Sequence, residues 1–106
     1  MISSALVGGI CPIALGIAWA LKRQSSSAKV WTFVGDMTAT SGIFAETARY
    51  AMQHALPIQF VIEDNGMSVC TPTRETWGTE QPIPVLKGYS YALTRAHVGV
   101  GKWVRF

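Results

Sequence analysis

The sequence has few charged residues, few cysteines and no internal repeat. Only 14% of the residues are charged and 49% are hydrophobic, which excludes a disordered chain and favours a protein with much buried or subunit-facing surface. Cys11 and Cys70 are far apart in sequence, so neither a disulfide framework nor a zinc site is supported. We therefore expect a globular oligomer in the reducing cytoplasm.

Charge and length bound the function further. The net charge of +3 is compatible with a small anionic ligand as well as with nucleic acid. Residues 2–21 carry no charge, but they contain three glycines and a proline and lack the positively charged start of a signal peptide, so we do not expect a membrane span. A chain of 106 residues predicts one domain over residues 1–106, and its shortness indicates part of a larger enzyme.

A strand, a helix and a second strand are predicted at the centre of the chain. VWTFV at residues 30–34 is typical of a strand covered on both faces, and IQFVI at residues 58–62 is a second apolar strand. Thr40 or Ser41 can cap a helix that runs to about His54. Its apolar face is predicted to comprise Ile43, Phe44, Thr47, Ala48, Ala51 and Ala55. The pattern predicts an α/β fold with a mostly parallel sheet and a βαβ crossover.

The flanking segments are less regular. Residues 12–21 have the pattern of a buried helix with Pro12 in its first turn. Residues 71–84 hold three prolines and predict an extended loop. Residues 88–95 and 102–106 have strand-like composition and predict a C-terminal β-hairpin.

Polar residues follow both predicted strands. Asp36 comes after the first strand and Asn65 after the second, and ligands of open parallel sheets bind beyond the carboxyl ends of the strands. A carboxylate and an amide oxygen suit Mg²⁺, which completes its coordination with phosphate oxygens and water. Amides at the start of the helix, in residues 37–42, would favour the phosphate. The alternative is ordinary turn chemistry, because Gly-Asp and Asp-Asn-Gly are common turn sequences.

Three ordered segments resemble the thiamine diphosphate-dependent enzymes. The run GDMTATSGIFAETARYAMQHALPIQFVIEDNG (residues 35–66) is similar to the thiamine diphosphate motif, which starts with Gly-Asp-Gly and ends in Asn-Asn. LVGGICPIALGIAWA (residues 6–20) is similar to the segment that touches the aminopyrimidine ring. NGMSVCTPT (residues 65–73) is similar to the loop after the metal site. Together they most resemble the alpha subunit of 2-oxo acid dehydrogenases over residues 4–78.

The resemblance implies the roles of individual residues. Asp36, the Asn65 side chain and the Met67 carbonyl would ligate Mg²⁺. The amides of Met37 and Thr38 would hold the diphosphate of the cofactor, thiamine diphosphate, and the backbones of Ala5 and Val7 would contact the pyrimidine. The substrate would be a 2-oxo acid, and the partner a pyrimidine-binding beta-type subunit or a second copy of the chain. No residue of this chain matches the carboxylate that activates the cofactor, which the partner would supply.

The sequence departs from the family pattern in three places. Met37 replaces the second glycine, which would cost roughly 1 to 2 kcal/mol if that position needs positive φ. Asp64 replaces the first Asn of the pair, and residues 87–106 match no later part of the family's subunits. A transketolase-like or decarboxylase relative is the nearest enzymatic alternative, since all share the metal motif.

Other polar residues are weaker candidates. His54 and His97 are more simply structural or surface residues, since no paired carboxylate or nucleophile accompanies them, and Glu46 is a helix residue. Gly99, Gly101 and Lys102 lack the Ser or Thr of a phosphate loop. The tail also interleaves basic and aromatic residues, an alternative basis for single-stranded nucleic-acid binding that an interface hairpin would equally explain. Its members are Lys87, Tyr89, Tyr91, Arg95, Lys102, Trp103 and Arg105.

Overall fold

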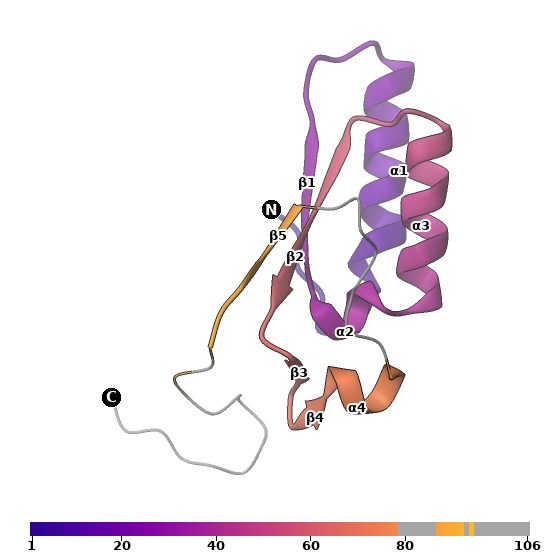
Figure 1. The fold of residues 1–106 in the computed structure, drawn as a ribbon. Helices are drawn as coiled ribbons and strands as arrows, with labels where there is room; N and C mark the ends of the chain where they lie inside the picture. The colour runs from indigo at the N-terminus through magenta and orange to yellow at the C-terminus, as the bar shows by residue number, and fades with distance from the viewer. Residues whose placement is uncertain (79–86, 93, 95–106) are drawn as a thin grey trace.

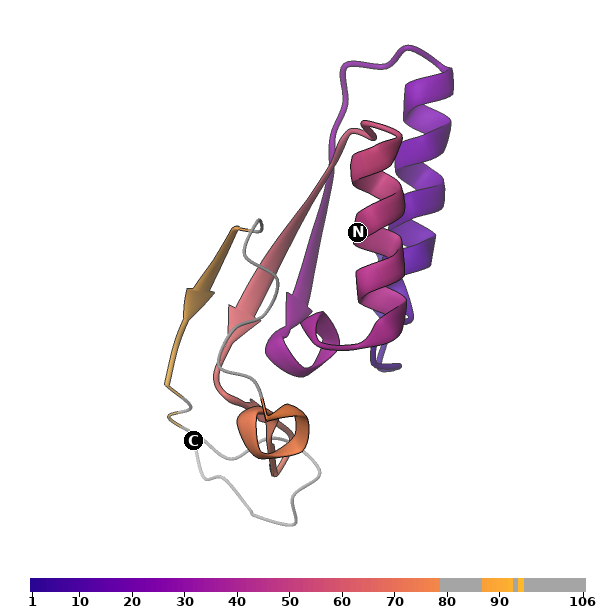
Figure 2. The ribbon, with the colours of Figure 1, turned by 45° about the vertical axis from the view of Figure 1, so that its right-hand side comes forward.

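The structure is a computed structural model and describes residues 1–78, 87–92 and 94. A three-stranded sheet carries two long helices on one face (Figures 1 and 2). In chain order, the elements are α1 (Ile10–Arg23), β1 (Val30–Gly35), α2 (Asp36–Ala39), α3 (Gly42–Gln53), β2 (Ile58–Asp64), β3 (Met67–Ser68), β4 (Thr71–Pro72), α4 (Thr73–Trp77) and β5 (Lys87–Ser90). The predicted α/β class and parallel βαβ unit are confirmed.

The sheet has the order β1-β2-β5, and both pairs are parallel. In the register, Val30 lies opposite Ile58 and Gly35 opposite Glu63. β5 covers the start of the predicted C-terminal hairpin, but it pairs with β2 as a parallel strand. The other half of that hairpin, residues 102–106, lies outside the described residues. The sequence pattern indicated only that these residues form a strand. It could not show that the strand pairs with the distant β2 rather than with the segment that follows it.

The core lies between the sheet and α3. Phe44 is fully buried and packs edge-on against Phe60, with ring centroids 5.2 Å apart. Ser41 caps α3 by accepting a hydrogen bond from the Phe44 amide at 3.4 Å, as predicted. Two members of the predicted apolar face are not part of it, because Ile43 is exposed and Ala55 follows the helix with φ of 44°.

β1 and α1 are less buried in this chain than the sequence predicted. β1 is not covered on both faces, since Trp31 and Phe33 are 54% and 56% exposed on the face away from the helices. α1 is not buried all round: it buries its small residues Cys11, Ala14 and Ala18, while its isoleucines Ile13 and Ile17 are exposed. Both helices pack on the same face of the sheet (Figure 2). The exposed residues on β1 and α1 leave apolar surface open on both layers.

The segment after β2 is more regular than predicted. Residues 71–84 were expected to form an extended loop, but β4 and α4 occupy residues 71–77, and residues 79–84 lie outside the described part. α4 ends at Gly78, which has the left-handed conformation with φ of 60°. These short elements lie close to α2 at the lower end of the sheet in Figure 1.

Candidate functional site

The carboxyl ends of β1 and β2 lie side by side. Gly35 pairs with Glu63. Asp36 directly follows β1 and Asp64 is the last residue of β2, so both lie at the same edge of the sheet. α2 contacts β3, which brings the first predicted cluster (residues 36–38) to the second (residues 64–67). The structure thus places the residues at the sheet edge where ligands of parallel sheets bind.

Asp36 is a buried carboxylate at the first position of α2. It is 4% exposed, and its Oδ2 atom has no hydrogen-bond partner among the described residues. A buried ionised oxygen without a partner is costly unless a cation or a donor compensates it. This orphaned oxygen fits a divalent cation.

Asn65 lies in a tight turn after β2. Its Oδ1 accepts a hydrogen bond from the Met67 amide at 2.9 Å, and its Nδ2 donates to the Tyr91 hydroxyl at 3.0 Å. Asp64 Oδ1 accepts from the Gly66 amide at 2.9 Å. Gly66 has φ of 73°, a conformation that favours glycine. An amide oxygen has two lone pairs, so Asn65 Oδ1 keeps one for a cation.

The Met67 carbonyl is not satisfied by its ladder partner. Met67 lies opposite Pro72 in the β3–β4 pair. Because the adjacent Gly66–Thr73 pair is hydrogen-bonded, Met67 and Pro72 form a non-hydrogen-bonded pair, in which the carbonyls point away from the partner strand. Thr73 closes the turn, because its amide donates to the Gly66 carbonyl at 3.0 Å. The hydroxyl of Thr73 is buried and has no partner in the described part of the chain.

α2 presents the amides predicted to bind the diphosphate. Gly35 precedes it without any side-chain cap, so the first-turn amides, including those of Met37 and Thr38, are not capped. Met37 is helical and does not have positive φ, so replacing the motif's glycine causes no backbone strain. Its sulfur accepts a hydrogen bond from Trp77 Nε1 at 3.0 Å, which ties α4 to α2.

Ala5 and Val7 lie in the exposed segment before α1. The neighbouring Gly8 has φ of 78°, and a Cβ atom there would lie 2.5 Å from Cγ2 of Ile43. Ile43 is the second residue of α3, which follows α2 closely. The segment that holds Ala5 and Val7 therefore lies beside the start of α3.

The set of ligands has the composition that Mg²⁺ prefers. Within the described ranges, no three His, Cys, Asp or Glu side chains gather in a group that could hold a metal. One carboxylate, one amide oxygen and one carbonyl are all oxygen ligands, and Mg²⁺ commonly completes such a set with phosphate oxygens and water. The residues present thus fit a magnesium ion that is bound together with a phosphorylated cofactor.

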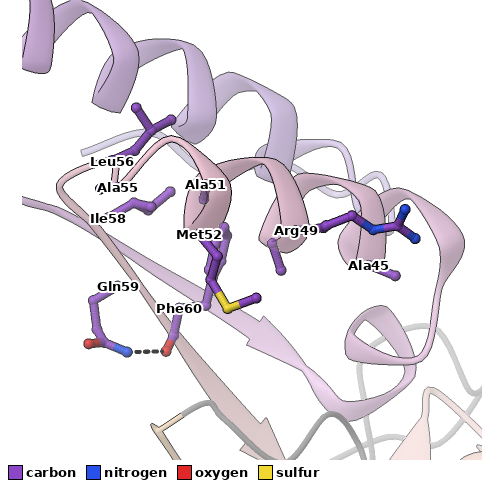
Figure 3. Close-up of a pocket in the computed structure, with 10 residues that line it drawn as sticks. Ala45, Arg49, Ala51, Met52, Ala55, Leu56, Ile58, Gln59 and Phe60 are labelled. Atoms are coloured by element: carbon purple, nitrogen blue, oxygen red, sulfur yellow. Dashed lines mark hydrogen bonds between the residues drawn. The ribbon is translucent and has the colours of Figure 1, made fainter.

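A cavity beside α3 differs in its chemistry from the carboxyl edge of the sheet. It has a volume of about 430 Å³, and its lining is mostly apolar, with Arg49 as its charged residue. Figure 3 shows Gln59 bonded to the carbonyl of the adjacent Phe60. The cavity lies by the amino end of β2, whereas ligands of parallel sheets bind at the carboxyl end. Its lining is Ala45, Ala48, Arg49, Ala51, Met52, Ala55, Leu56, Ile58, Gln59 and Phe60.

The weaker candidates keep structural roles where they are described. His54 ends α3 and packs on Trp19 and Tyr50, with ring centroids 5.0 and 4.2 Å away. Glu46 is exposed on α3. Burial raises the pKa of the Cys11 thiol, so it stays protonated in the core. His97 and residues 99–102 lie outside the described part.

Sequence reasoning missed the contacts of the tyrosines after β2. Tyr89 donates a hydrogen bond to Glu63, which raises the pKa of that phenol, and Tyr91 contacts Asn65. These contacts depend on the pairing of β5 with the distant strand β2, so no pattern within either segment gave a signal for them. No helix in the described part is long and apolar enough to cross a membrane.

Comparison with known proteins agrees with this geometry. A family model described as "Dehydrogenase E1 component" matches residues 1–95. The chain is 33% identical over 67 residues to the pyruvate dehydrogenase E1 component subunit alpha of Staphylococcus aureus, covering 63% of this chain and 18% of that protein. It is 28% identical over 95 residues to the 2-oxoisovalerate dehydrogenase subunit alpha 2, mitochondrial, of Arabidopsis thaliana, covering 90% and 20%.

The chain spans about a fifth of the length of these curated relatives. The family model includes all three segments identified from sequence, and it extends to residue 95. The first part of the tail, residues 87–95, therefore matches the family, although the sequence analysis did not expect a match there. The resemblance is confirmed, and this chain belongs to the dehydrogenase E1 component family.

Proposed function

We propose that this chain binds thiamine diphosphate through Mg²⁺ as part of a 2-oxo acid dehydrogenase. The observation that carries the proposal is the buried Asp36 oxygen, which has no hydrogen-bond partner in the part of the chain that the structure describes and lies at the sheet edge where the Asn65 turn also lies. Membership of the dehydrogenase E1 component family supports the same conclusion. The names of the relatives support a 2-oxo acid as the substrate class.

Each site residue has a distinct role in this proposal. Asp36, the Asn65 Oδ1 atom and the Met67 carbonyl would hold Mg²⁺, which commonly binds together with phosphate groups. The amides of Met37 and Thr38 would donate to phosphate oxygens at the start of α2. The backbones of Ala5 and Val7 would contact the pyrimidine. When bound, thiamine diphosphate supplies the electron sink for decarboxylation.

The open apolar surface supports association with another chain. Trp31 and Phe33 on the sheet and Ile13 and Ile17 on α1 are exposed, and clusters of exposed apolar side chains favour interaction sites. The partner would be a pyrimidine-binding beta-type subunit or a second copy of this chain.

Calorimetry tests the site assignment. We expect thiamine diphosphate to bind the purified chain with Mg²⁺ present and not after chelation by EDTA. Asp36→Ala should abolish the metal-dependent binding, whereas Glu46→Ala, which removes an exposed carboxylate of α3, should not. Equal affinity with and without Mg²⁺, or unchanged affinity in Asp36→Ala, would contradict the proposal.

A further inference from the structure

Tyr89 of β5 and Tyr91, which follows that strand, contact Glu63 of β2 and Asn65 just beyond its end. In the parallel register, Tyr89 lies opposite Glu63, and the Tyr91 amide donates to the Asp64 carbonyl at 2.8 Å. The Tyr89 hydroxyl bonds to Glu63, and the Tyr91 hydroxyl bonds to Asn65. The two rings lie 6.2 Å apart, so both point to the same side of the sheet.

The contact with Tyr91 concerns which end of the Asn65 amide faces the metal position. A backbone N–H can only donate, so the atom that faces the Met67 amide at 2.9 Å is the oxygen. The other end is then the NH₂ group, which donates to the Tyr91 hydroxyl at 3.0 Å. If this amide were rotated by half a turn, its NH₂ group would replace the oxygen. The NH₂ group would then face the Met67 N–H and the cation, and both contacts would be repulsive.

We infer that Tyr91 is a positioning residue for the metal site: the Met67 amide selects the orientation of the Asn65 side chain, and the Tyr91 hydroxyl holds its NH₂ end in place so that the oxygen stays at the metal position. The inference rests on the proposed function. Hydrogen bonds to the far end of a metal ligand commonly fix its orientation, and their loss weakens metal binding. The main-chain bond from Tyr91 to Asp64 keeps the ring at the end of β2, so the hydroxyl is already in place before any ligand binds.

Tyr89 provides a matched control. It has the same side chain, lies two residues away in the same segment and is similarly exposed, at 51% against 45% for Tyr91. Its hydroxyl bonds to Glu63 rather than to a proposed ligand. Removing either hydroxyl should therefore affect β5 similarly, but only one removal should affect the metal site.

The experiment measures the Mg²⁺ affinity of the full chain by calorimetry in the presence of thiamine diphosphate, and the unfolding temperature without ligands. Tyr91→Phe should weaken Mg²⁺ binding about 10- to 100-fold, while Tyr89→Phe should leave it nearly unchanged. The ligand-free unfolding temperatures of the two variants should agree. In an Asn65→Asp background, Tyr91→Phe should have little effect, since a carboxylate offers oxygen at both ends.

The outcomes separate this inference from the proposed function. If the unaltered chain binds Mg²⁺ and thiamine diphosphate but Tyr91→Phe binds as tightly, the positioning role is wrong and the site stands. The role is also wrong if the loss is as large in the Asn65→Asp background, because it would then come from a displaced β5. If the unaltered chain binds neither, both proposals fail.

Discussion

At Asp36, the absence of a hydrogen-bond partner for Oδ2 within the described residues predicts an unusual stability effect. Asparagine has nearly the same size but no charge, so burying it costs less. We expect Asp36→Asn to leave the ligand-free chain as stable as before, or to stabilise it by on the order of 1 kcal/mol. Urea unfolding measures the difference.

Bound ligands should make the unaltered chain more stable than Asp36→Asn. With Mg²⁺ and thiamine diphosphate at about 100 times the dissociation constant, binding should stabilise the unaltered chain by roughly 2.7 kcal/mol, and Asp36→Asn should gain little. Glu46→Gln is the control, since it neutralises a carboxylate exposed on α3. A clear destabilisation of ligand-free Asp36→Asn would show that the carboxylate already makes a favourable contact.

Individual site residues differed in how well sequence predicted them. Asp36 and Asn65 were predictable because each follows a short apolar run, and parallel strands end at the same edge of a sheet. Their roles as metal ligands remain predictions. The contact of Tyr91 with Asn65 was not predictable, because it depends on a strand pairing between segments 26 residues apart that no local pattern encodes.

Among the elements, α3 depends on a single capping side chain. Ser41 accepts from the Phe44 amide at 3.4 Å and donates to the Thr38 carbonyl at 2.6 Å, so it joins α3 to α2. Ser41→Ala should destabilise the chain by about 1 kcal/mol. Thermal unfolding should show the loss, with Ser41→Thr retaining most of the stability.

The control for the cap is Ser27→Ala, in the exposed loop before β1. This substitution should change the unfolding temperature little, because a surface position away from caps and core contributes little. If Ser41→Ala unfolds at the same temperature as Ser27→Ala, then α3 is held by packing of Phe44 alone and the cap is dispensable.

The longer elements were predictable from sequence and the short ones were not. β1, α3 and β2 have apolar runs or helical periodicity long enough to be recognised, and their predicted ends differ from the observed ones by one or two residues. α2 and α4 are four and five residues long, which is too short for a periodic pattern. β5 has strand-like composition, but composition cannot identify a partner that lies elsewhere in the sequence.

For the whole molecule, the acidic residues limit what the chain can catalyse alone. Activation of the cofactor needs a carboxylate aligned with its pyrimidine, which the family resemblance attributes to the partner subunit. Within the described part, Glu63 accepts from Tyr89 and Asp64 from the Gly66 amide. Glu46 and Glu75 are exposed on α3 and α4, and Asp36 is the proposed metal ligand.

We therefore predict that the chain loaded with Mg²⁺ and thiamine diphosphate does not accelerate exchange of the cofactor's C2 proton. A positioned general acid or base typically contributes about 10²- to 10⁴-fold, and that contribution should be missing. Exchange into deuterated water, followed by proton NMR, measures the rate against free cofactor at the same pH. Addition of a pyrimidine-binding beta-type subunit should restore acceleration. Exchange clearly faster than for free cofactor without that subunit would mean that a carboxylate of this chain performs the activation, and Glu46→Gln and Glu75→Gln would then identify whether either one is responsible.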